Sequence, residues 1–101
     1  MKTLEVRVPY AITREEVKRR MDEALVKARE EYGSQVGPIQ ADWVGDQLKV
    51  NLSAMGMKFA GTIDIEDKDL LVRLGLPGMA SLFAGKVKAG IEERLGGLVA
   101  G

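Results

Sequence analysis

The sequence contains neither histidine nor cysteine among its 101 residues. Histidine is the commonest general base and metal ligand, and cysteine supplies thiolate nucleophiles, metal ligands and disulfides. We therefore expect a protein that is not an enzyme, with no catalytic residues, no metal site and no cofactor. The lack of cysteine also excludes a disulfide scaffold and fits a cytoplasmic protein.

Charge of either sign is not in excess, because 15 basic residues balance 15 acidic ones. A net charge of zero gives no electrostatic case for binding nucleic acid or an anionic membrane, and it permits a homo-oligomer. Long apolar runs are also missing, so no transmembrane segment is expected. Residues 1–7 have no apolar stretch after their charges, so they do not form a signal peptide.

Alternation of apolar and polar residues predicts five β-strands. The inward-facing positions are Leu4, Val6 and Val8; Ile39, Ala41 and Trp43; Leu48, Val50 and Leu52; Met57, Phe59, Gly61, Ile63 and Ile65; and Leu70, Val72, Leu74 and Leu76. Gly45 and Asp46 form a tight hairpin turn between the second and third strands. Residues 54–56 and 66–69 form the next two turns.

Two amphipathic helices flank this block of strands. Thr13 and Glu16 form a capping box that starts the first helix, and Gly33 is placed to cap its end. The second helix is predicted over residues 79–99, and Gly90 beside its apolar stripe allows close approach to a strand. That buried stripe consists of Ala80, Phe83, Ala84, Val87, Ile91, Leu95 and Leu98. Residues 96–101 are expected to fray.

These elements predict one α+β domain over residues 1–101, in the order β-α-β-β-β-β-α. The short turns favour an antiparallel sheet, and both helices are expected on its apolar face. The opposite face is mostly polar and should meet water. The topology is similar to a shortened helix-grip fold.

Several residues allow both a structural and a functional interpretation. Trp43, in the inward register, is interpreted as a core anchor. Residues 66–69 are interpreted as a solvated turn, because they lack the spacing of a calcium loop. Methionines at 21, 55, 57 and 79 either fill the core or form an adaptable apolar surface.

A function-bearing surface, if present, is expected near the last helix. It would be an apolar ligand- or partner-binding surface formed by Met55, Met57, Met79, Leu82 and Phe83. Exposed apolar patches on soluble proteins usually mark a partner, a lipid or a polymer surface.

The chain resembles a small bacterial family of polyhydroxyalkanoic acid system proteins, also called granule-region proteins. The resemblance rests on Trp43-x-Gly45-Asp46-x-Leu48-x-Val50, Gly61-Thr62-Ile63, Val72-x-Leu74-x-Leu76, and a helix with Phe83, Ile91 and Leu95. It implies a link to polyhydroxyalkanoate gene clusters and no established activity. Many members carry a histidine ahead of the first helix, where this chain has Pro9-Tyr10-Ala11-Ile12.

Two functions follow from these observations. The first is a non-enzymatic accessory protein of polyhydroxyalkanoate metabolism that binds a protein partner or the granule surface. The alternative is a small helix-grip-like carrier or sensor of an apolar, acyl-type ligand held between the sheet and the last helix. A carrier requires a closed pocket, whereas a granule binder requires an open patch.

Overall fold

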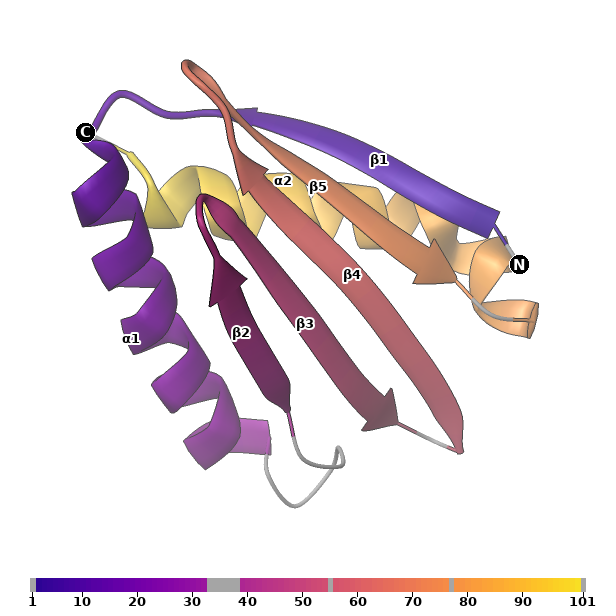
Figure 1. The fold of residues 1–101 in the computed structure, drawn as a ribbon. Coiled ribbons are helices and arrows are strands. Elements are labelled where there is room, and N and C mark those ends of the chain that lie inside the picture. The colour runs from indigo at the N-terminus through magenta and orange to yellow at the C-terminus, as the bar shows by residue number, and fades with distance from the viewer. Residues whose placement is uncertain (1, 33–38, 55, 77, 101) are drawn as a thin grey trace.

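The structure is a computed structural model that describes residues 2–32, 39–54, 56–76 and 78–100. Its elements follow the predicted order of one strand, one helix, four strands and one helix (Figure 1). The elements are β1 (Lys2–Pro9), α1 (Arg14–Tyr32), β2 (Gln40–Val44), β3 (Gln47–Ala54), β4 (Met57–Ile65), β5 (Asp69–Leu76), the 3₁₀ helix η1 (Gly78–Phe83) and α2 (Ala84–Leu98).

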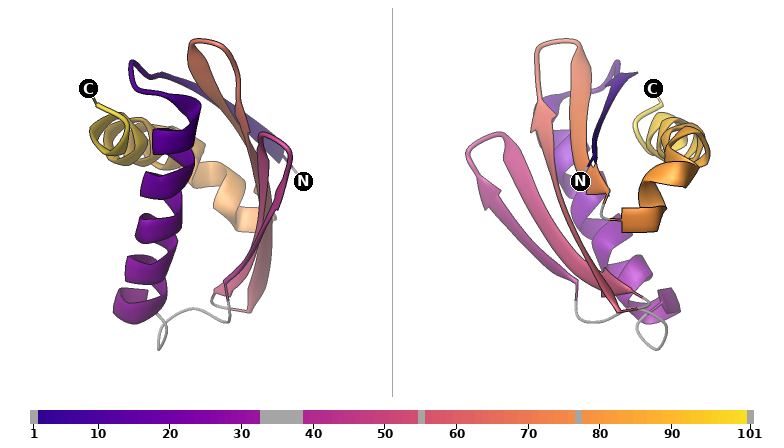
Figure 2. Two further views of the ribbon diagram at one scale, coloured as in Figure 1. Left: turned by 60° about the vertical axis from the view of Figure 1, so that its left-hand side comes forward. Right: turned by 90° about the vertical axis from the view of Figure 1, so that its right-hand side faces the viewer.

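The strands form one five-stranded antiparallel sheet in the order β1-β5-β4-β3-β2. Strands β2 to β5 are neighbours in sequence, and β1 adds to the free side of β5. Both helices lie on the same side of the sheet (Figure 2). The predicted α+β class and its two-layer arrangement are therefore confirmed.

The strand register gathers the alternating apolar side chains on the face that the helices cover. One row crosses the whole sheet and contains Trp43, Leu48, Ile63, Val72 and Val6. A shift of one residue in any strand would send its apolar set to the other face, so the pattern defines this register strongly.

Leu71 and Val44 are exceptions to the polar character expected of the opposite face, and Leu71 is the buried one. It lies out of phase with the inner residues, yet only 4% of it is exposed. Its cross-strand partners are Arg7 and Asp64, which have long or polar side chains.

The hairpin between β2 and β3 has the predicted turn. Gly45 has a φ of 62°, and the ladder closes between Val44 and Gln47. Positive φ is costly for residues with a Cβ, so glycine suits this position. Gly56 has a φ of 76° in the next turn, and Met55 beside it lies outside the described residues.

Helix α1 begins with half of the predicted capping box. The Glu16 amide donates a hydrogen bond of 3.1 Å to Thr13 Oγ1. The Glu16 carboxylate does not return to Thr13, because it accepts hydrogen bonds from Arg19 and Arg20. The expected cap at Gly33 lies outside the described residues.

The C-terminal part of the chain differs from the prediction in two ways. The helix predicted from residue 79 starts as η1 and becomes α-helical only at Ala84. The predicted fraying is also wrong at Val99, which is 1% exposed and donates its amide to Leu95 O at 3.0 Å. Arg20 Nη1 donates to Leu98 O at 3.0 Å and to Ala100 O at 2.9 Å, so α1 holds this end in place.

A candidate apolar binding groove

The inner face of the sheet is buried at one end and only partly buried at the other, apart from Leu76 at the end of β5, which is 1% exposed. We call the closed end the part built on Leu48, Ile65 and Leu70, which are all at most 4% exposed. We call the open end the part built on the half-buried residues Val50, Leu52, Phe59 and Leu74. Burial therefore changes along the strands although their apolar alternation continues.

Helix α1 covers the closed end with its first two turns. Val17 is 0% exposed and Met21 is 3% exposed, and both belong to the same buried cluster as Leu48 and Leu70. Positions 17 and 21 share one face because they are separated by four residues. Val99, just beyond α2, joins this cluster as well.

Ion pairs hold the start of α1 over the turns of the sheet. Arg14 Nη1 lies 2.6 Å from Asp46 Oδ2, and Lys18 Nζ lies 2.9 Å from Asp46 Oδ1. Arg14 also pairs with Asp67. The hydrogen bond from Lys18 and the nearby guanidinium of Arg14 hold the pKa of Asp46 below its ordinary value.

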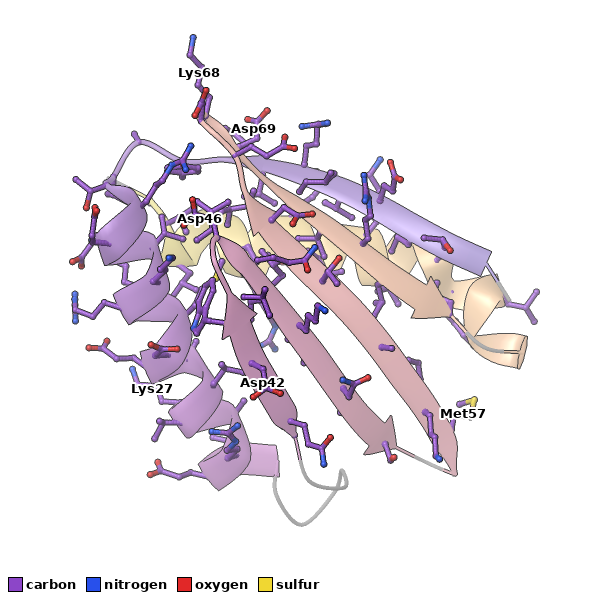
Figure 3. All side chains as sticks on the ribbon, in the orientation of Figure 1. Lys27, Asp42, Asp46, Met57, Lys68 and Asp69 are labelled. Carbon is purple, nitrogen blue, oxygen red and sulfur yellow. The ribbon has the colours of Figure 1, made fainter. Side chains whose placement is uncertain are left out.

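The acidic turn between β4 and β5 is exposed at residues 66–68, as predicted for a solvated turn, and it also contacts neighbouring elements. Glu66 Oε1 lies 2.7 Å from Arg7 Nη1, and the Tyr10 hydroxyl donates to Glu66 O. Asp46 and Asp69 lie at the end of the sheet opposite Met57 (Figure 3). Within the described residues, no three acidic side chains are grouped as metal ligands.

Trp43 is half-buried, so the expected core anchor is only partly enclosed. It packs against the buried cluster, and its Nε1 donates to Asp22 Oδ1 at 2.9 Å. Lys18 Nζ lies 5.4 Å from the ring centroid, within the range of a cation–π contact. These partners tie Trp43 to α1 and give it a structural role.

Helix α2 lies against β1, but its side chains are less deeply buried than those at the start of α1. Phe83, Val87, Ile91 and Leu95 are spaced four residues apart, as the predicted stripe requires. However, none of the described side chains of α2 is fully buried, and Phe83 before it is 55% exposed. The prediction that this stripe is buried core is therefore wrong in degree.

A groove of about 390 Å³ lies between α2 and the sheet. We call it the inner groove, and it is lined by Ile63, Val72, Val87, Gly90, Ile91, Arg94 and Leu95. A Cβ added at Gly90 would meet nothing within 4 Å. The expected close approach at Gly90 is thus absent, and the glycine borders open space.

A second hollow of about 150 Å³ continues the groove over the open end of the sheet. It shares Ile63, Val72 and Ile91 with the inner groove and also contacts Leu52 and Phe59. The two hollows together form a continuous apolar surface beneath and beside α2.

The predicted surface residues fall in different places. Leu82, 74% exposed, and Phe83 lie together at the end of η1, next to the start of the α2 stripe. Met57 is half-buried at the start of β4. Met55 and the side chain of Met79 lie outside the described residues.

Sequence reasoning missed Arg94, which is the charged residue lining the inner groove. Its position three residues after Ile91 was the signal that places it beside the apolar stripe.

A broader depression of about 560 Å³ lies mainly on the outer face of the sheet. It arises where a row of small or short residues, including Ala60 and Gly75, crosses the strands. Its lining also includes Lys58, Asn51 and Ser53, so this surface is mixed and polar. The inner groove is the more apolar of the two surfaces and is the candidate site.

Residues 4–98 match the protein family described as "Putative polyhydroxyalkanoic acid system protein (PHA_gran_rgn)". The comparisons with curated proteins and with solved structures give no match. No helix in the described part of the chain has the length and apolar character needed to cross a membrane.

Proposed function

This chain belongs to the polyhydroxyalkanoic acid system family, and from that premise we propose that it is a non-enzymatic accessory protein that binds the apolar polyester surface of a granule. The observation that carries the proposal is the inner groove. Leu82 and Phe83 are exposed at the end of η1, five and four residues before Val87 of the groove lining. Apolar surface of this kind is stabilised when water is removed from it.

The open shape of the inner groove favours binding of an extended apolar surface over binding of an enclosed small ligand. The helix stripe beside the groove is only partly buried at Val87 and Ile91, so a flat or extended apolar partner can reach the exposed part of both side chains. The alternative, a carrier of an acyl-type ligand, is supported by the groove volume of about 390 Å³, which falls within the range of small-molecule sites. Such sites normally enclose most of the ligand, and this one is open on one side.

The absence of histidine and cysteine from the sequence supports a binding role over catalysis. The carboxylates of Asp46 and Glu66 are engaged by basic side chains of α1 and β1 in ion pairs. Carboxylates held in this way are poor candidates for general acid–base chemistry. The lack of cysteine also supports the cytoplasm as the place of action.

Co-sedimentation with polyhydroxyalkanoate particles tests this proposal. Leu82→Glu places a charge on the exposed end of η1 and should remove most particle binding. Val26→Glu is the matched control, because Val26 is 52% exposed on α1, away from the groove lining. It should bind as the unchanged protein does.

Both variants should unfold near the wild-type midpoint, because substitutions at exposed sites usually change stability by less than about 0.5 kcal/mol. Full particle binding by a folded Leu82→Glu variant would contradict the proposal. Equal loss of particle binding in both variants would indicate that any added negative charge repels the particle, and it would contradict a specific site near Leu82.

A further inference from the structure

Arg94 differs from the other arginines of this chain. Six arginines form hydrogen bonds or ion pairs within the structure: Arg7, Arg14, Arg19, Arg20, Arg29 and Arg73. Among the described residues Arg94 has no such partner, although Glu92 and Glu93 precede it on α2. Its guanidinium is therefore available to an external anion.

The same arginine lines the inner groove, where the other lining residues are apolar or glycine. From this juxtaposition we propose that the groove binds a free aliphatic carboxylate, with its chain along Val87 and Ile91 and its carboxylate on Arg94. The inference rests on the proposed function, because it uses the same groove, and it adds the chemical class of a soluble ligand.

Both the charged residue and the apolar walls of the groove suit an aliphatic carboxylate. The planar guanidinium matches a carboxylate through two parallel hydrogen bonds, which a neutral hydroxyl group cannot reproduce. The walls formed by Ile63, Val72 and Leu95 offer no hydrogen-bonding side chain, so they favour a hydrocarbon chain. Open space beside Gly90 leaves room for that chain next to the helix.

Titrations followed by amide chemical shifts at low ionic strength can test the two contacts separately. The probes are hexanoate and octanoate, with 1-hexanol and 1-octanol as the uncharged counterparts. The eight-carbon ligands have two more methylenes than the six-carbon ligands, and they should bind up to about fifteenfold more tightly in both series. The carboxylate should bind about fivefold more tightly than the alcohol of equal length, as expected for a solvent-accessible ion pair.

Arg94→Gln should remove the preference for carboxylate and leave the affinity for octanol unchanged. Lys88→Gln is the matched control, because Lys88 is an exposed cation on the same helix and does not line the groove. It should keep the preference. The methyl ester of octanoate should bind as the alcohol does, which separates a free acid from an esterified polymer chain.

Three results would overturn the inference: no binding of octanoate, equal affinity for octanoate and octanol, or equal loss of preference in both variants. These titrations contain no particles. If they fail while Leu82→Glu still abolishes particle binding, the groove binds polymer without a role for Arg94, and the proposed function stands. If particle binding fails and the titrations succeed, the carrier function replaces the granule function.

Discussion

The closed and open ends of the sheet carry the same kind of apolar alternation but are covered to different depths. At the closed end Val17 and Met21 of α1 are almost entirely enclosed. Over the middle of the sheet Val87 and Ile91 of α2 are only partly buried beside the inner groove, and Ile91 also borders the hollow over the open end. The comparison teaches that strand pattern determines which face is apolar, whereas helix docking determines how much of that face water can reach.

The two helices are attached in different ways, which accounts for this contrast. α1 is held over the strand turns by Arg14 and Lys18, whose shared partner is Asp46. α2 lies against β1 and is held at its C-terminal end, where Arg20 donates to Leu98 O and Val99 enters the core. Its N-terminal half continues into η1, whose end presents Leu82 and Phe83 to solvent.

The largest expected effect is the difference between truncating Met21 and truncating Ile91. Met21→Ala should lower the free energy of unfolding by about 2–5 kcal/mol, as is typical of a fully buried site. Ile91→Ala should cost about 1–2 kcal/mol, because a half-exposed side chain loses less buried area. Urea unfolding of both variants measures the difference.

Equal losses of unfolding free energy in Met21→Ala and Ile91→Ala would mean that the side chains of α2 are packed as tightly as those of α1. In that case the inner groove would be closed in solution, and the distinction between the two ends of the sheet would disappear.

A smaller effect is expected at Gly90. Gly90→Ala should raise the free energy of unfolding by about 0.5–1 kcal/mol, because alanine favours the helix and its Cβ meets nothing within 4 Å. Thermal unfolding measures this gain. Gly61→Ala is a matched contrast, since a Cβ there would lie 2.9 Å from Arg73 O and should destabilise the sheet. Destabilisation by Gly90→Ala would show that α2 closes on the sheet.

The strands and their register could be predicted from the sequence because a period of two leaves a single apolar face. The Gly45 turn could be predicted because positive φ favours glycine. The depth of burial at Phe83, Val87 and Ile91 could not be predicted from the sequence. The apolar residues of a helix have the same spacing whether they are fully or only partly buried against a sheet. The position of Arg94 in the groove lining could not be predicted, because it depends on which side of α2 faces the groove.

The smallest expected effect concerns acid stability at Glu16. Hydrogen bonds from Arg19, then from Arg20, lower the pKa of Glu16 from 4.5 to about 2. The charged form therefore favours the folded state, and its contribution is complete above pH 4.5 and is lost as the pH falls toward 2. Glu16→Gln should be less stable than the wild type at neutral pH.

The stability curves of Glu16→Gln and the wild type should converge below this pH range, and added salt should reduce the difference because the groups are exposed. Urea midpoints measured from pH 2 to 7 would record this. A constant offset between the two proteins at every pH would show that the ionisation of Glu16 does not contribute.

Thiol labelling at position 87 tests the central claim most directly. The claim is that the inner groove beside α2 is open to solvent in the free protein and becomes covered when the protein binds an apolar polyester particle. The chain has no cysteine of its own, so each single-cysteine variant reports on one position. In the free protein Val87→Cys should react much faster than Val17→Cys, and polyhydroxyalkanoate particles should protect it while Val26→Cys stays reactive. Slow labelling at position 87 without particles, or unchanged labelling with them, would contradict the account.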